Sequence, residues 1–110
     1  MVRYELKSLV LDSGRCPFEE WMEGLRDLKG VAIVRTRLDR VTLGNLGNCR
    51  SLKGGMWELK IDFGPGYRVY YGMHRERIIL LLGGGDKSSQ DRDIREARSN
   101  WQSFLDKEVK

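Results

Sequence analysis

Apolar residues recur with two different periods along this chain, and the period changes near residue 49. Between residues 17 and 41 they recur every three or four positions, which is the spacing of one face of an α-helix. From residue 49 to residue 73 they alternate with polar residues, as in a β-strand with one buried side. The pattern therefore predicts helices followed by a sheet.

An N-terminal strand and two helices are predicted before residue 48. Residues 4–11 mix apolar and charged side chains and end at a turn over residues 12–14, so we expect a strand. Pro17 suits the first turn of a helix, and Gly30 interrupts the helical period before a second helix runs to Val41. We expect the two helices to form a hairpin packed on the sheet.

Four further strands are predicted at residues 49–52, 56–63, 67–73 and 78–82. Apolar and charged residues occupy opposite sides of the second and third of these strands, so one face of the sheet is expected to be core and the other polar. A short loop at residues 64–66 would set Phe63 opposite Tyr67 and Asp62 beside Arg68. The last strand is apolar on both sides, which predicts a central strand covered on both faces.

A final helix completes the predicted fold. The glycine-rich residues 83–87 are expected to leave the sheet, and Ser88 with Asp91 resembles a capping box ahead of an apolar stripe that reaches Leu105. Residues 1–110 are therefore predicted to form one α+β domain. It would contain an antiparallel (mostly) sheet of four or five strands, an N-terminal helical hairpin and a C-terminal helix.

Composition limits the classes of partner and site. Lys and Arg number 20 against 16 Asp and Glu, which gives a net charge of +4 and favours partners that carry phosphate. The two cysteines stand far apart with a single histidine elsewhere, so we expect reduced thiols and neither a metal nor a cofactor. No apolar run reaches the roughly 18 residues of a membrane span, so we expect a cytoplasmic protein with no membrane contact.

The polar side of the predicted sheet is the main candidate surface. It carries Glu58, Lys60, Asp62, Arg68 and Tyr70, and neighbouring segments add Arg50 and Lys53. Guanidinium groups bind phosphate oxygens in pairs, and strands hold neighbouring side chains rigidly. The alternative is an ordinary solvated sheet face on which Asp62 pairs with Arg68. The pattern alone leaves both interpretations open.

The glycine run at residues 83–85 leads to Lys87. The run lacks the spacing of a phosphate-binding P-loop. Glycines could let the backbone turn sharply and bring Lys87 toward the polar surface, near a helix N-terminus that attracts anions. The alternative is a plain strand-to-helix connection with a solvated lysine.

Two segments of the chain carry a specific resemblance. They are ELKIDFGPGYRVYY at residues 58–71 and LLGGGDKSSQ at residues 81–90, followed by Asp93 and Ile94. Together with Phe18, Trp21 and the glycine-bearing loop at residues 44–47, they closely resemble the RelE/ParE toxin superfamily. Within it, the chain is most similar to the HigB-like branch called addiction module killer proteins.

The resemblance implies the toxin of a type II toxin-antitoxin system. Such toxins are mostly mRNA interferases, metal-independent endoribonucleases that cut mRNA on the ribosome and so inhibit translation. The ribose 2′-hydroxyl attacks the adjacent phosphate and leaves a cyclic phosphate and a 5′-hydroxyl. The implied partners are the ribosome, mRNA and a cognate antitoxin with a DNA-binding helix-turn-helix. Toxin and antitoxin would form a heterotetramer.

The resemblance also implies roles for individual residues. Arg68 would stabilise the transition state, Lys60 would bind phosphate or act as base, and Lys87 would hold phosphate or protonate the leaving oxygen. Glu58 and Tyr70 are further acid-base candidates. The RNA-binding set would be Arg50, Lys53, Arg68 and Lys87. We expect the Arg68 side chain to face outward, so that Arg68→Ala would remove toxicity with little loss of stability.

Two departures and two alternatives stay open. The C-terminal helix replaces the strand residues that serve catalysis in RelE, and no counterpart of the HigB histidines is evident, so the general acid and base are unassigned. One alternative is a ParE-like inhibitor of DNA gyrase, which acts by binding protein. The other is a toxin fold without activity that survives as a regulatory binder.

Overall fold

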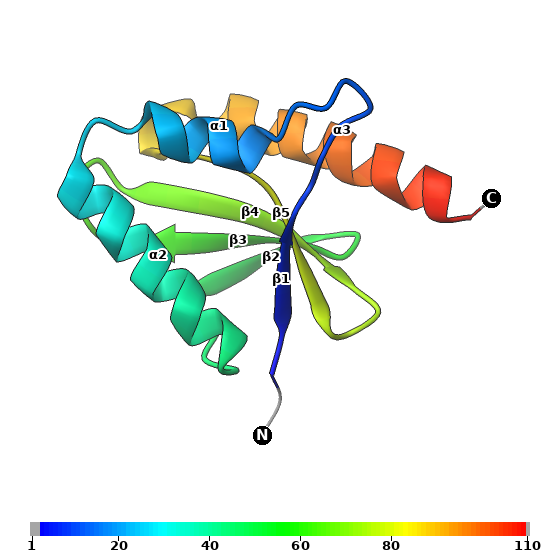
Figure 1. Ribbon diagram of the computed structural model, residues 1–110, viewed down its shortest axis with the longest axis horizontal. Coiled ribbons are helices and arrows are strands. Elements are labelled where there is room, and N and C mark those ends of the chain that lie inside the picture. Colours follow the sequence, from blue (N-terminus) through cyan, green and yellow to red (C-terminus); the bar gives the residue numbers. More distant parts are fainter. Residues whose placement is uncertain (1–2, 110) are drawn as a thin grey trace.

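The computed structural model describes residues 3–109, which form a five-stranded sheet with helices on both faces (Figure 1). Its elements, in chain order, are β1 (Glu5–Ser8), α1 (Pro17–Gly24), α2 (Leu28–Thr42), β2 (Cys49–Lys53), β3 (Met56–Ile61), β4 (Tyr67–His74), β5 (Ile78–Gly85), a 3-10 turn (Lys87–Ser89) and α3 (Gln90–Glu108). The predicted α+β class is confirmed. The sheet has five strands, within the predicted four or five. Among these described residues, no helix is both long enough and apolar enough to cross a bilayer.

The strands lie in the order β1-β5-β4-β3-β2. The last four form an antiparallel meander, whereas β1 pairs in parallel with β5 and sets Glu5 opposite Ile78. The sheet is therefore antiparallel except at one edge. Since β5 lies between β1 and β4, the prediction of a central position for this apolar strand is confirmed.

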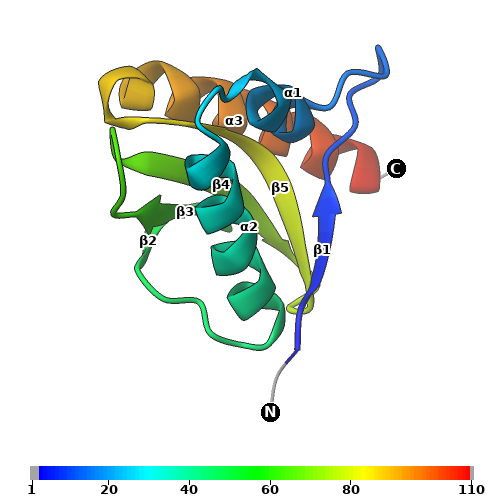
Figure 2. The same cartoon turned by 60° about the vertical axis from the view of Figure 1, so that its left-hand side comes forward.

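Both faces of the sheet are covered, so the prediction of one polar face is wrong over much of its area. One buried cluster joins α1 and α2 to the sheet through side chains such as Phe18 and Val34. A second cluster, on the other face, packs Met56 and Tyr70 against Trp101 of α3. Figure 2 shows α2 in front of the strands and α3 running along the top behind α1. The apolar stripe of α3 has to be buried somewhere, and this face supplies the matching apolar side chains.

The register of β3 and β4 differs from the predicted register by two residues. Ile61 lies opposite Tyr67, and Lys60 lies opposite Arg68. A shift of two residues keeps every side chain on its predicted face, because side chains in a strand alternate with period two. It changes the neighbours, however, and it places Asp62 in the loop and not beside Arg68.

The glycine run does not leave the sheet as predicted. Gly83, Gly84 and Gly85 continue β5 and pair with residues of β4. A Cβ atom on Gly84 would lie 2.2 Å from the ring of Trp21, so a glycine is needed where α1 packs tightly on the strand. The predicted capping box is also wrong, since Asp86 accepts a hydrogen bond from the backbone N–H of Ser88 at 2.8 Å.

The break between the first two helices lies before Gly30, not at it. Residues 25–27 separate α1 from α2, and Gly30 is buried within α2. A Cβ atom there would lie 2.8 Å from the ring of Tyr67, so this glycine serves a close approach of helix and sheet. Figure 1 shows α1 and α2 meeting at a corner, so they do not form the predicted antiparallel hairpin.

Candidate functional site

Three cationic side chains meet at one hollow of about 240 Å³, formed by β2, β3, β4 and the first residue of α3. We call it the basic hollow. Its lining residues are Asn48, Arg50, Glu58, Lys60, Arg68 and Gln90. Three cations against one carboxylate leave a net charge of +2 on these side chains. The hollow can therefore accept an anion such as a phosphodiester.

Arg68 is buried, so the prediction that its side chain faces outward is wrong. Its side chain is 8% exposed, and its strand lies between two others, with Lys60 opposite on β3 and Gly85 opposite on β5. Its Nε–H has no hydrogen-bond partner among the described residues, and its Nη1 lies 4.0 Å from Oε1 of Glu58. Arg68 lines the hollow, and its ion pair with Glu58 is long, so its guanidinium keeps charge for an incoming oxygen.

Glu58 is the other buried charge at this site, with its side chain 3% exposed. Its Oε1 lies 3.1 Å from Nη2 of Arg50, and its Oε2 accepts a hydrogen bond from Nε2 of Gln90 at 2.8 Å. A carboxylate buried to this degree requires compensating charge and hydrogen bonds. Glu58 therefore holds Arg50 over the hollow and is itself held from the side of α3.

Lys60 is an exposed cation of the hollow, as Arg50 is. The N–H of Lys60 donates to the carbonyl oxygen of Asn48 at 2.9 Å, which ties β3 to the segment before β2. Arg68 lies directly opposite on β4. The alternative of a solvated face with an Asp62–Arg68 pair is wrong, because the described ion pairs of Arg68 involve Glu58 and not Asp62.

Tyr70 does not face the surface as predicted. It is fully buried under α3, and its hydroxyl makes no hydrogen bond to any described residue. Burial chiefly, and then the nearby negative charge of Glu58, raise the pKa of Tyr70. Tyr70 therefore belongs to the core, where it cannot exchange protons with a bound nucleotide.

We expect Tyr70→Phe to leave the stability at pH 7 unchanged or slightly higher, because it removes a buried hydroxyl that has no partner. At alkaline pH the sign is clear. A tyrosine whose pKa is raised by folding stabilises the protein below the ordinary value of 10.0, and that contribution is lost as the pH rises above it. Urea unfolding at pH 7 and pH 10.5 should show a smaller alkaline loss for the variant. An equal loss in both proteins would contradict the assignment.

Lys53 and Lys87 lie outside the basic hollow. Lys53 is the last residue of β2, where its carbonyl oxygen faces Arg98 of α3. Lys87 is exposed beside Gly66 of the β3–β4 loop, and it borders a different surface with Arg92 and Arg95. The structure thus brings four of the predicted site residues together, namely Arg50, Glu58, Lys60 and Arg68.

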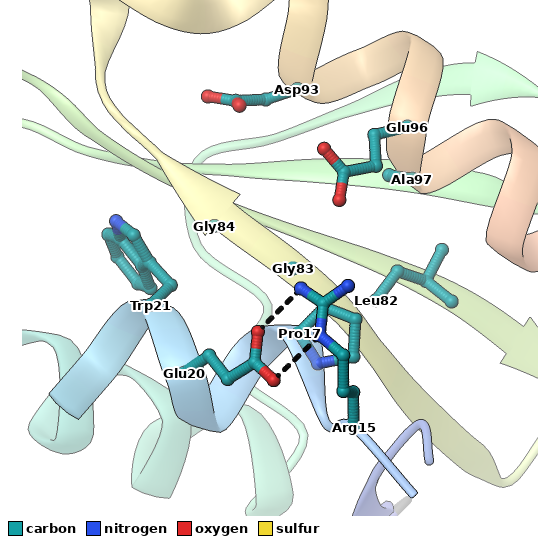
Figure 3. A pocket seen from close by; sticks show the side chains of 10 residues that line it. All are labelled: Arg15, Pro17, Glu20, Trp21, Leu82, Gly83, Gly84, Asp93, Glu96 and Ala97. Carbon is teal, nitrogen blue, oxygen red and sulfur yellow. Dashed lines mark hydrogen bonds and ion pairs between the residues drawn. The ribbon is translucent and has the colours of Figure 1, made fainter. Parts of the chain in front are cut away.

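A second pocket of about 250 Å³ lies between α1, the end of β5 and α3 (Figure 3). Its arginine, Arg15, is already paired with Glu20, with 2.8 Å between Nη2 and Oε1. Asp93 and Glu96 of α3 add two further carboxylates to the lining. This pocket is unsuited to phosphate, because its arginine is paired and carboxylates outnumber it.

Sequence reasoning missed two lining residues, Asn48 and Gln90. Asn48 stands in a loop, and Gln90 begins a helix 32 positions beyond its partner Glu58. No periodic pattern marks either residue. The one available signal is the segment at residues 81–90, which closes with Gln90.

Comparison with known proteins gives one informative relative. The chain is 42% identical over 81 residues to a protein of Haemophilus influenzae (strain ATCC 51907 / DSM 11121 / KW20 / Rd) described as an uncharacterized protein. The matched segment covers 74% of this chain and 82% of that protein. No family model and no solved structure matches the chain.

Proposed function

We propose that this chain, which belongs to the same family as the Haemophilus influenzae protein, is the toxin of a type II toxin-antitoxin pair and a metal-independent mRNA endonuclease that acts on the ribosome. The observation that carries the proposal is Arg68, a buried guanidinium that lines the hollow together with Lys60 and whose ion pair with Glu58 is long, at 4.0 Å. The resemblance to the RelE/ParE superfamily at residues 58–71 supports it.

The hollow supplies the groups that RNA cleavage by the 2′-hydroxyl requires. The ribose 2′-oxygen attacks the adjacent phosphorus, the bond from phosphorus to the 5′-oxygen breaks, and a 2′,3′-cyclic phosphate and a 5′-hydroxyl remain. Negative charge grows on the phosphate oxygens, and Arg68 and Lys60 are placed to neutralise it. Glu58 takes the proton from the 2′-hydroxyl, and water at the open side of the hollow protonates the 5′-oxygen.

Lys87 has a more distant role in this proposal. It lies beside the β3–β4 loop and outside the hollow, on an exposed surface that also carries Arg92 and Arg95. These cations would hold phosphates that flank the cleaved one, or ribosomal RNA, through ordinary charge attraction. Lys53 would contribute in the same way from the end of β2.

The remaining partners follow from the same proposal. A cognate antitoxin with a helix-turn-helix would bind the protein in the cytoplasm and inhibit it. Two copies of each protein would form a heterotetramer. The basic hollow is an obvious place for an acidic antitoxin side chain to compete with phosphate.

The test is induction of the gene in growing cells, followed by mapping of mRNA 5′ ends. Lys60→Ala is the variant, and Lys7→Ala is its control, because both lysines are exposed and lie in strands while Lys7 is on β1, away from the hollow. We expect wild type and Lys7→Ala to cut mRNA at positions set by codon. Lys60→Ala should cut at least about tenfold less.

Intact mRNA in cells whose growth nevertheless stops would contradict the proposal. If supercoiling of DNA is then defective, the function is the inhibition of gyrase. If growth continues, the protein is a binder without toxicity.

A further inference from the structure

We infer that Gln90, the first residue of α3, is a positioning residue that fixes the Glu58 carboxylate for proton transfer. This inference rests on the proposed function and assigns a role to a residue outside the resemblance-based site. Gln90 lines the basic hollow, and its Nε2 donates to Oε2 of Glu58 at 2.8 Å.

The two oxygens of Glu58 are held differently. Oε2 is occupied by the hydrogen bond from Gln90, whereas Oε1 lies between Arg50 at 3.1 Å and Arg68 at 4.0 Å. The Oε1 side is therefore the side on which a phosphate bound to Arg68 would bring its ribose. Because Gln90 holds Oε2, it sets the rotation of the carboxylate plane and presents Oε1 to that side.

The other contacts of Glu58 cannot set this orientation alone. Arg50 has a side chain that is 60% exposed, so it can follow an incoming phosphate and leave the carboxylate. The hydroxyl of Tyr70 lies near Glu58 but makes no hydrogen bond of ordinary geometry with it. Gln90 is then the neutral donor that remains. Its position is fixed, because it begins a helix of 19 residues whose apolar side chains, including Trp101, are packed against the sheet.

The geometry also makes the packing of α3 a condition for activity. The helix begins at Gln90, directly after a short turn that is closed by the Asp86 side chain. A shift of the first turn of α3 by about 1 Å would break the bond to Glu58, and displacements of that size can lower the rate of a positioned reaction substantially.

The test is a double-mutant cycle on cleavage by purified protein in a reconstituted translation reaction. The four proteins are wild type, Gln90→Ala, Glu58→Ala and the double variant. We expect Gln90→Ala to lower the cleavage rate constant at saturating ribosomes at least about tenfold, with less than about threefold change in the half-saturating concentration. In the Glu58→Ala background, the same change should have no further effect.

Gln102→Ala is the matched control, because Gln102 also bonds a carboxylate, that of Asp106, on the exposed side of the same helix. It should cleave like wild type. A second readout needs no RNA: the side-chain amide signals of Gln90 in an NMR spectrum should move when Glu58 is replaced by Ala, and those of Gln102 should not.

The outcomes separate the positioning role from the proposed function. Equal losses from Gln90→Ala in both backgrounds, or a loss confined to ribosome binding, would overturn the positioning role while the proposed function stands. Unmoved Gln90 amide signals in the Glu58→Ala protein would overturn it as well. A wild-type protein that cleaves nothing would remove the proposed function, and the positioning role with it, even if the NMR contact is present.

Discussion

Replacement of Arg68 by Ala is expected to abolish mRNA cleavage, with a loss of about 100- to 1,000-fold, the usual effect of removing one preorganised donor to a developing negative charge. The guanidinium is the one buried cation among the residues that line the basic hollow. Arg68→Lys should recover part of the activity at most, because an ammonium cannot bind two phosphate oxygens side by side. Quantified 5′ ends from reconstituted translation reactions measure both variants.

Arg68→Ala should also destabilise the fold, contrary to the expectation from sequence. Truncation leaves a gap beside a carboxylate that is 3% exposed and takes away one of its cationic neighbours. Arg50 and Gln90 still compensate Glu58, so the loss should be about 1–3 kcal/mol and not larger. Urea unfolding measures the loss.

Arg40→Ala is the control for both effects. Arg40 is exposed on α2, and it is outside the hollow. It should unfold within about 0.5 kcal/mol of wild type, as is usual for surface sites, and retain most of its cleavage. A stable, fully active Arg68→Ala protein would remove Arg68 from both roles.

The largest loss of stability is expected from Gly72→Ala, about 2–4 kcal/mol, because the added methyl group has no room. Its Cβ atom would lie 2.4 Å from the ring of Trp101. That ring cannot easily move, since it is buried, stacks on Phe104 with 5.7 Å between ring centroids, and donates from Nε1 to the carbonyl oxygen of Gly54 at 2.7 Å. The variant should unfold at lower urea and show altered tryptophan fluorescence.

Gly83→Ala is the matched control for this variant. Gly83 also lies inside a strand of the same sheet, but a Cβ atom there meets nothing within 4 Å. Its stability should stay within about 0.5 kcal/mol of wild type. If the two variants lose equal stability, the cause would be backbone conformation and not the contact with Trp101.

The spacing of apolar residues predicted the place of most helices and strands, because it indicates which side of each element is buried. Helix α1 begins at Pro17 as predicted, and β5 is central as its apolar run indicated. The same spacing cannot count the residues in a loop, so the β3–β4 register came out two positions away. It also cannot tell a glycine that ends an element from one that permits a close approach, as at Gly30 and Gly84.

The candidate site was predictable where residues share one strand pair, and not where a distant segment closes over them. Lys60 and Arg68 are opposite each other on neighbouring strands. Burial of Tyr70 depends on α3, whose position over the sheet is a tertiary feature with no local signal in the sequence. For the same reason Gln90 was missed, although it contacts Glu58 directly.

The parallel pairing of β1 with β5 has a consequence for synthesis. Glu5 and Ile78 are separated by more than seventy residues of chain, yet they are neighbours in the finished sheet. The earliest strand to leave the ribosome must therefore wait for the last strand of the sheet, and pairing over such a distance is slow. The sheet should therefore close only late in synthesis, after all five strands have been translated.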